Sequence, residues 1–292
     1  MKAYGAVGDG VSDDAQAIQN AINGMFILMF KQSCYTNLLE DAGGNGASRI
    51  SNQFGTTGQP AVVYIPSGVY ILSRPLQLYV GTVLMGNPIR PPALRARLGF
   101  NGGSIIFAKD PNHSASNNFY ISVKNLILDS TKLSQYTSFT LMDWSVSQAT
   151  QLTNMVFDML PQSSGQIGLA MAKGGSGIVI GDLTFNGGAI GINIGSLQSS
   201  VSSISVKSVS FNGCSTAIKI TSSFASVFQS VSFNQASIGI EMSSPGVGSV
   251  SLIDSAAKNV GVVMSTASSG LGDHSIVIDN FVSGSNVPLA SS

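Results

Sequence analysis

A short pattern recurs between Val123 and Ser283, and it constrains the fold more than any other feature of the chain. Segments such as LTNMVFDM at Leu152, VKSVSFNG at Val206 and FQSVSFNQ at Phe228 alternate apolar residues with polar or small ones. Alternation with a period of two indicates half-buried β-strands. The spacing between matched central residues falls from 29 to 21 residues along the series Leu126, Met155, Leu183, Val209, Val231 and Leu252. Apolar residues at the matched strand positions, such as Leu126, Val156, Leu183, Val209 and Val231, are expected to stack inward in rows.

A second short strand lies between successive copies, as in IGINIG at Ile190 and IGIEMS at Ile238. A repeat of this length cannot bury its apolar side alone, but stacking on its neighbours does bury it, so each repeat is one coil of a solenoid. Leucine-rich repeats have similar periods, yet they need a regular leucine spacing that these segments lack. Constant strands joined by turns of varying length favour a parallel β-helix.

The charge composition excludes several classes of partner. Only 10% of the residues are charged and the formal net charge is zero, so we expect no nucleic-acid or anionic-membrane partner. No apolar run reaches the roughly 20 residues that a membrane-spanning helix needs. No signal peptide is expected, because Met1 leads directly into the first motif. Cys34 and Cys214 are far apart in the sequence and suggest no disulfide framework.

The N-terminal stretch YGAVGDGVSDDAQAIQNAI predicts a turn followed by a helix over Asp13–Asn23. Ser12 is a favourable N-cap, and acidic residues are favoured in a first turn. The apolar stripe of this helix suits a cover over the first coil, whose strand edges would otherwise be open. Asp9, Asp13 and Asp14 could instead form a metal or acid–base cluster, although turn and cap chemistry is the simpler interpretation.

The same N-terminal motif, G-A-x-G-D-G-x-x-D-D, resembles the opening of the pectate-lyase superfamily, which includes rhamnogalacturonase-like and epimerase-like members. The resemblance implies an all-β fold, a right-handed single-stranded parallel β-helix with an N-terminal capping α-helix. We expect residues 1–292 to form one such domain. An irregular insertion at about 24–59 interrupts the pattern and is expected to lie outside the β-helix.

Several further motifs in order resemble glycoside hydrolase family 55, the fungal exo-β-1,3-glucanases. They include VVYIPSGVYILSRPL at Val62, WSVSQATQLTNMVF at Trp144 and IGDLTFNGGAIGINIG at Ile180. Members of that family have two β-helices side by side, with sugar in the groove between them, and this chain corresponds to the first. The resemblance implies a β-1,3-glucan or related neutral polysaccharide as partner, a second β-helix absent from this chain, and an extracellular location. It also places the general acid glutamate in the second half.

The residues offer few candidates for catalysis. Glycoside hydrolysis normally uses two carboxyl groups about 5–10 Å apart. The chain has two glutamates, Glu40 in the insertion and Glu241 on a predicted strand, where it is either a site residue or a solvated position. Asp143 beside Trp144 could place a carboxylate near an aromatic platform for sugar, or Trp144 could simply pack at a corner. The catalytic residues therefore stay unknown.

Other enzyme classes find less support. The acidic motifs of polygalacturonases are absent, and all five arginines precede Leu98, outside the repeats where a pectate lyase would need one. His113 and His274 are isolated, so no histidine metal site and no cofactor are expected. Asp129, Asp158, Asp182 and Asp254 fall at predicted strand ends, where turn hydrogen bonds are the ordinary explanation.

The glucanase resemblance points to four substrate-binding residues in the sugar groove: Gln148, Thr150, Gln166 and Gln198. Uncharged amides suit neutral sugar hydroxyls because they donate and accept hydrogen bonds without a charge to desolvate. The same side chains could equally be turn residues or a buried amide ladder. Leu197 stands where a second amide is usual beside Gln198, which departs from the family pattern.

Two functions from different classes follow. The chain is either half of an exo-β-1,3-glucanase, expected to be inactive alone, or a non-catalytic β-glucan-binding or scaffold β-helix. One N-glycosylation sequon, Asn112-His113-Ser114, lies on a predicted loop and favours a secreted protein.

Overall fold

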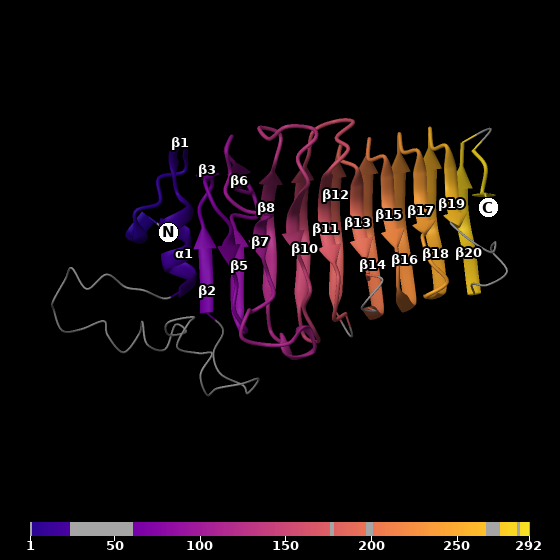
Figure 1. The fold of residues 1–292 in the computed structure, drawn as a ribbon, viewed down its shortest axis with the longest axis horizontal. Helices are drawn as coiled ribbons and strands as arrows, with labels where there is room; N and C mark the ends of the chain where they lie inside the picture. Colours follow the sequence, from indigo (N-terminus) through magenta and orange to yellow (C-terminus); the bar gives the residue numbers. More distant parts are fainter. Residues whose placement is uncertain are drawn as a thin grey trace.

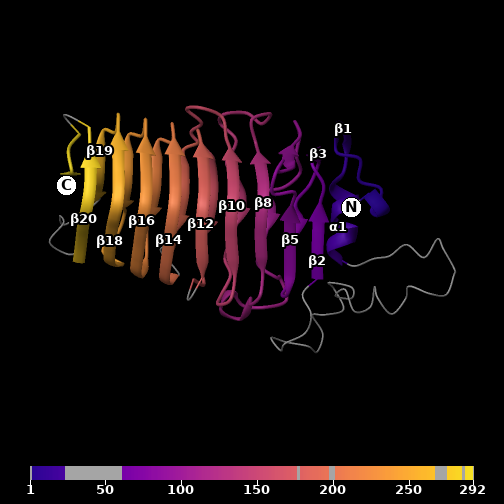
Figure 2. The same ribbon diagram turned by 180° about the vertical axis from the view of Figure 1, so that it is seen from behind.

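The computed structural model describes residues 2–23, 61–175, 178–196, 201–266, 275–284 and 287–291. Within these residues the chain winds into a parallel β-helix whose strands stack along one axis (Figure 1, Figure 2). Every strand pair with a defined register is parallel, with shared hydrogen bonds between successive coils. The predicted fold class is therefore confirmed. The predicted insertion at 24–59 lies outside the described residues.

Two sheets carry the coils. The first sheet has 12 strands, namely β1 (Asp9–Asp13), β2 (Ala61–Ile65), β3 (Val69–Leu72), β5 (Thr82–Gly86), β6 (Ala93–Ala96), β8 (Ser122–Asp129), β10 (Gln151–Asp158), β12 (Val179–Asn186), β14 (Val201–Asn212), β16 (Ser223–Asn234), β18 (Val247–Lys258) and β20 (Ser275–Ser283). The second sheet has nine, namely β4 (Leu76–Gln77), β7 (Ser104–Phe107), β9 (Phe139–Asp143), β11 (Gln166–Met171), β13 (Ile190–Ile194), β15 (Thr216–Ile220), β17 (Ile238–Met242), β19 (Val262–Thr266) and β21 (Ala290–Ser291).

The first sheet bends along a row of residues in the left-handed region. From β8 onward each of its strands holds one residue with φ between 49° and 60°. In β14 this residue is Ser208, and the alternation slips there: Val206 and Val209 are both buried, with two outward positions between them. The slip turns the strand at this position. The row consists of Asn125, Asn154, Asp182, Ser208, Ser230, Asp254 and Asn280.

The apolar positions predicted to stack inward are confirmed with one exception. Leu126, Leu183, Val209 and Val231 are at most 1% exposed. The inward prediction for Val156 is wrong, because Val156 is half-buried on the outside and the neighbouring Met155 takes its place. The slip at the left-handed residue before Met155 shifts the alternation by one position, which simple period-two counting does not anticipate.

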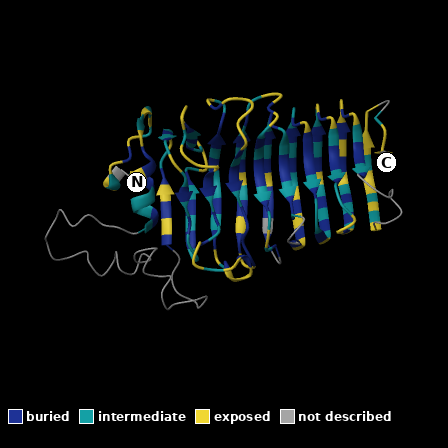
Figure 3. Ribbon diagram, in the orientation of Figure 1, coloured by how far each residue is buried: buried dark blue, intermediate teal, exposed yellow. Residues whose placement is uncertain are grey.

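Aromatic rings form the centre of the regular coils. Phe157, Phe185, Phe211 and Phe233 stack in successive coils with ring centroids 4.5, 5.0 and 5.8 Å apart. A Cβ at Gly191 would lie 2.5 Å from the ring of Phe211, so only glycine fits beside the stack there. The strands between β2 and β19 each hold buried residues, whereas β1 and β20 at the two ends of the first sheet hold none (Figure 3).

Helix α1 (Ala15–Asn23) covers the N-terminal end, with Ile18 and Ile22 fully buried. The predicted helix starts too early, since Asp13 and Asp14 precede it. Asp14 is buried and its carboxylate accepts the amide N–H groups of Val7 and Gly8 at 2.7 and 3.1 Å.

Ser12 is not the N-cap, since its hydroxyl donates to Asp9 Oδ2 at 2.9 Å. Asp13 Oδ1 instead accepts from the amide of Ala15 at 3.2 Å. The N–H groups of Ser12 and Val11 lower the pKa of Asp9. Turn and cap chemistry thus explains these aspartates. Among the described residues, no group of three or more His, Cys, Asp or Glu side chains could hold a metal ion.

Candidate functional site

A row of polar side chains runs along the ends of the first-sheet strands from β6 to β18. Its members are paired in register from coil to coil. Parallel neighbours lie about 4.8 Å apart, so these side chains stand one above another. We define the polar ladder as Arg95, Asp129, Asp158, Asn186, Asn212, Asn234 and Lys258.

The middle of the polar ladder is uncharged and internally hydrogen-bonded. Asn186 Nδ2 donates to Asp158 Oδ1 at 2.7 Å, and Asn212 Nδ2 donates to Asn186 Oδ1 at 3.0 Å. Asn234 Nδ2 continues the chain to Asn212 Oδ1 at 3.1 Å. An asparagine amide has two donors and an oxygen with two lone pairs. Each half-buried rung therefore keeps hydrogen-bonding capacity that its neighbours do not use.

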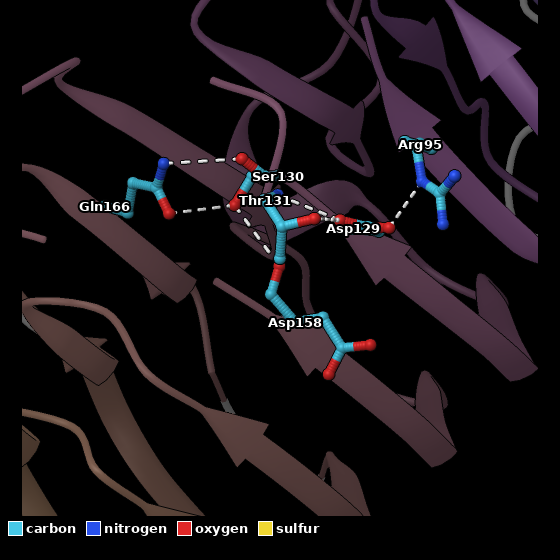
Figure 4. Close-up of polar contacts among 6 residues, drawn as sticks. All are labelled: Arg95, Asp129, Ser130, Thr131, Asp158 and Gln166. Carbon is cyan, nitrogen blue, oxygen red and sulfur yellow. Dashed lines mark hydrogen bonds and ion pairs between the residues drawn. The ribbon is translucent and has the colours of Figure 1, made fainter. Parts of the chain in front are cut away.

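The N-terminal end of the ladder is charged. Arg95 Nε lies 2.6 Å from Asp129 Oδ2, and Asp129 Oδ1 accepts the N–H and hydroxyl of Thr131 at 2.8 and 2.6 Å (Figure 4). The backbone carbonyl of Asp158 accepts the amide of Ser130 at 2.9 Å. Both aspartates thus take part in the turn bonding expected at strand ends.

Asp129 and Asp158 form a carboxylate pair on adjacent coils, and their surroundings argue against acid–base chemistry. Both oxygens of Asp129 are occupied, and the residue is only 5% exposed. A general acid or nucleophile needs an oxygen that can reach the substrate. The pair therefore fixes the turn after β8 and does not supply the two independent carboxyl groups of a glycosidase.

Gln166 lies inside the corner next to this turn. It is fully buried, and its Oε1 accepts from the hydroxyl of Ser130 at 3.0 Å and from the amide of Leu160 at 2.9 Å. Its Nε2 donates to the carbonyl of Ser130 at 3.4 Å. One side chain thus ties together the loops that follow β8 and β10. In this geometry Gln166 supports the corner and does not reach the surface.

The other predicted sugar-binding residues are placed differently. Gln148 is exposed in the connection between β9 and β10, where its Oε1 accepts from the hydroxyl of Ser147. Thr150 is buried, and its hydroxyl donates to the carbonyl of Ser147 at 2.7 Å. Gln148 and Thr150 are therefore in one turn, at the opposite end of the first-sheet strands from Gln166. Gln198 lies outside the described residues.

Asp143 and Glu241, the two described carboxylates considered for catalysis, both make structural contacts. Trp144 is fully buried, so the packed-corner interpretation is confirmed and the aromatic platform beside Asp143 is wrong. Asp143 Oδ1 accepts the amide of Ser145 at 3.0 Å. Glu241 is paired across the second sheet with Lys219, with Nζ and Oε1 2.7 Å apart. Glu40 lies outside the described residues.

The sequence reasoning missed the polar ladder, although its signal was present. Asn186, Asn212 and Asn234 each end a repeat copy and each directly follow a buried phenylalanine of the stack. A polar residue at a fixed place in successive copies must stack on itself in a β-helix. This inference requires the coil register, which the shrinking repeat length obscured.

Comparison with known proteins identifies relatives over most of the chain. The family model described as rhamnogalacturonase A/epimerase, pectate lyase-like, matches residues 1–241. A probable glucan endo-1,3-beta-glucosidase of Arthroderma benhamiae is 32% identical over 239 residues, 79% of this chain and 24% of that protein. A glucan 1,3-beta-glucosidase of Cochliobolus carbonum is 30% identical over 70% of this chain and 24% of its own length.

A non-secreted LysM effector of Penicillium expansum is 34% identical over 70% of this chain and 13% of its own length. The chain thus spans about a quarter or less of the curated relatives it matches. Among solved structures, the mannuronan C-5 epimerase A-module of Azotobacter vinelandii aligns with a TM-score of 0.37 at 11% identity, covering 99% of this chain and 98% of that one. A Geobacillus virus E2 protein aligns with a TM-score of 0.43 at 14% identity, covering 97% and 60%.

Proposed function

This chain belongs to the rhamnogalacturonase A/epimerase, pectate lyase-like family, and from that premise we propose that it is the N-terminal β-helix of a glycoside hydrolase acting on β-1,3-glucan. In this proposal it contributes one wall of a groove for neutral sugar, and a second β-helix supplies the other wall and the general acid. Relatives named as glucan 1,3-beta-glucosidases support the substrate class.

The uncharged part of the polar ladder is the observation that carries the proposal. Beside the asparagines runs a second outward row, Thr184, Ser210 and Ser232, also in register and half-buried. Two parallel rows of amides and hydroxyls form a surface that binds by hydrogen bonds alone. Neutral polysaccharides match such a surface, because neither partner has a charge to desolvate.

The four residues expected in the groove take distinct parts in this proposal. Gln148 is exposed and offers its amide directly to sugar. Thr150 and Gln166 are buried and hold the turns that shape the rim. Gln198 stays a predicted sugar contact.

The isolated chain is proposed to bind glucan weakly and not to hydrolyse it. Positioned acid–base groups typically contribute 10²- to 10⁴-fold each, and the described residues contain no such couple. An open wall buries little of a sugar, so we expect a dissociation constant in the roughly millimolar range.

A non-catalytic glucan-binding or scaffold role is the second candidate. Two relatives favour this role, because they share this segment and are named non-secreted LysM effectors, not glucosidases. We propose an extracellular location for the glucan-hydrolase function. No helix in the described part of the chain has the length and apolarity to cross a bilayer.

Titration of the purified chain with laminarin, followed by calorimetry or affinity electrophoresis, tests the proposal. The double substitution Asn186→Ala and Asn212→Ala should weaken binding at least tenfold. Gln151→Ala is the matched control, because Gln151 carries an exposed amide at the start of β10, away from the polar ladder. This substitution should leave laminarin binding unchanged. Binding should be insensitive to salt, because no charges meet.

Absence of laminarin binding, or binding that the ladder variant retains in full, would contradict the role of the ladder. Circular dichroism of both variants separates loss of binding from loss of fold. Release of glucose from laminarin by this chain, abolished by Glu241→Gln or Asp143→Asn, would contradict its proposed inactivity.

A further inference from the structure

The loop between β7 and β8 forms a small closed unit at one edge of the β-helix. Asp110 lies at its base and is fully buried. The amide of Asp110 donates to Asn118 Oδ1 at 2.6 Å, and Asn118 Nδ2 donates to the carbonyl of Ser114 at 2.6 Å. Asp110 Oδ2 also accepts the amide of Val80 at 3.3 Å, which attaches the base to the preceding coil. The loop is thus held at its base by these hydrogen bonds.

Asn112 is exposed on the outer part of this loop, and Ser114 is exposed two residues later. The residue between them, His113, is not proline. These three residues make the only Asn-X-Ser/Thr sequence in the 292 residues of the chain. Asn-X-Ser/Thr is the acceptor sequence for N-linked glycosylation, which requires an accessible surface loop.

We propose that Asn112 is a site of N-linked glycosylation. In the transfer, Asn112 Nδ2 forms a bond to C1 of the first sugar of a lipid-linked oligosaccharide diphosphate. The bond from C1 to the diphosphate breaks, the lipid diphosphate leaves, and the amide nitrogen loses one proton. The hydroxyl of Ser114 is the second recognition element. Within the described residues, the one side-chain hydrogen bond of this hydroxyl is to the hydroxyl of Ser116, at 2.9 Å.

The loop can hold the glycan without rearrangement. Asn112 Nδ2 donates to Asp110 Oδ1 at 3.1 Å, and the amide of Asn112 donates to the same oxygen at 2.9 Å. A glycosylated amide keeps one N–H, so the side-chain contact survives the modification. The buried base formed by Asp110 and Asn118 is not touched.

The glycan would also leave the polar ladder open. The loop precedes Ser122, where β8 begins, whereas Asp129 of the ladder stands at the end of that strand. Seven residues of strand span about 20 Å. A glycan at Asn112 therefore occupies the opposite edge of the first sheet from the polar ladder.

The test is secretion of the chain from a yeast host behind a heterologous leader peptide, with glycopeptide mass spectrometry and peptide N-glycosidase treatment. We expect a single N-glycan at Asn112, lost in Asn112→Gln and in Ser114→Ala, and kept in Ser114→Thr. Asn101→Gln is the matched control, because Asn101 is an exposed loop asparagine outside any acceptor sequence. Circular dichroism should be alike for all variants.

Secreted, folded chain with an unmodified Asn112 overturns the proposal, as does a glycan that persists in Asn112→Gln. The result is independent of the proposed glucan binding. Glycopeptide mass spectrometry reads the modification without laminarin, so failure of one proposal does not mimic failure of the other.

Discussion

The coils before Asp158 and the coils after Val179 are built from the same kind of turn, yet they differ in regularity. In the later coils β14, β16 and β18 each have 12 residues and pair over nearly their whole length. In the earlier coils the strands from β1 to β7 have two to five residues, and longer loops leave the stack (Figure 1). We call the coils after Val179 the regular coils and the coils before Asp158 the irregular coils.

The difference lies in what each part can carry. The regular coils repeat the same residue at the same place, so rings stack on rings and amides bond to amides. The irregular coils hold the buried Asp110, the ion pair of Arg95 with Asp129, and the loop with Asn112. Repetition provides stability along the axis, whereas local chemistry needs residues that differ from those in the next coil.

The largest expected effect is on a stacked position of the regular coils. Leu183→Asp places an ionisable group in a fully buried row and should destabilise the fold by about 4 kcal/mol or more. Thr184→Asp changes the adjacent outward residue and should cost about 1 kcal/mol or less. Urea unfolding followed by circular dichroism measures both. Equal effects of the two substitutions would contradict the inward register of β12.

The sequence predicted this register well where copies repeat and poorly where the backbone turns within a strand. Leu126, Leu183 and Val209 were placed inward because the copies align. Val156 was misplaced, since nothing in a period-two pattern marks a left-handed residue such as Asn154 inside a strand. Asparagine tolerates that conformation, but serine at the matching position of later copies gives no such hint.

The candidate site was harder to predict than the fold. Sequence motifs can indicate that Gln148 and Gln166 belong to the groove segments of a family, but not which amide is exposed. Burial depends on the loops of neighbouring coils, here those after β8 and β10 that close over Gln166. The contacts between Gln166 and Ser130 join residues 36 positions apart and have no local signature.

The next effect concerns a buried thiol of the regular coils. Burial raises the pKa of Cys214 from 9.0 to about 12. A raised pKa means that the folded state binds the proton more tightly. The contribution to stability is therefore complete below pH 9 and lost as pH rises toward 12, amounting to about 4 kcal/mol.

Unfolding free energies of the native chain and of Cys214→Ala between pH 8 and 11 measure this contribution. The native chain should lose stability with pH more steeply than the variant, because other titrating groups are common to both. Parallel pH profiles would show that the thiol is not protected by burial.

A smaller effect compares the charged N-terminal end of the polar ladder with its uncharged middle. Arg95→Ala leaves the carboxylate of Asp129 buried without its ion pair and should cost about 1.5–3 kcal/mol. Asn212→Ala in the regular coils removes neutral hydrogen bonds and should cost about 1 kcal/mol. Thermal unfolding of the two variants orders them. A larger loss of stability in Asn212→Ala than in Arg95→Ala would contradict this order.

The smallest expected effect is on the ion pair that crosses the regular coils on the second sheet. Lys219 and Glu241 are 2.7 Å apart, but their side chains keep 32% and 21% of their surface exposed. Water and salt screen such a pair, so its coupling energy should be about 0.2–1 kcal/mol. A double-mutant cycle with Lys219→Ala and Glu241→Ala measures the coupling, and 1 M salt should reduce it further. A coupling well above 1 kcal/mol would mean that water screens charges on the outer face of the second sheet less than the exposed fractions of these side chains indicate. In that case the regular coils would hold charge as tightly as the irregular coils do at Arg95, and the contrast between the two parts would fail.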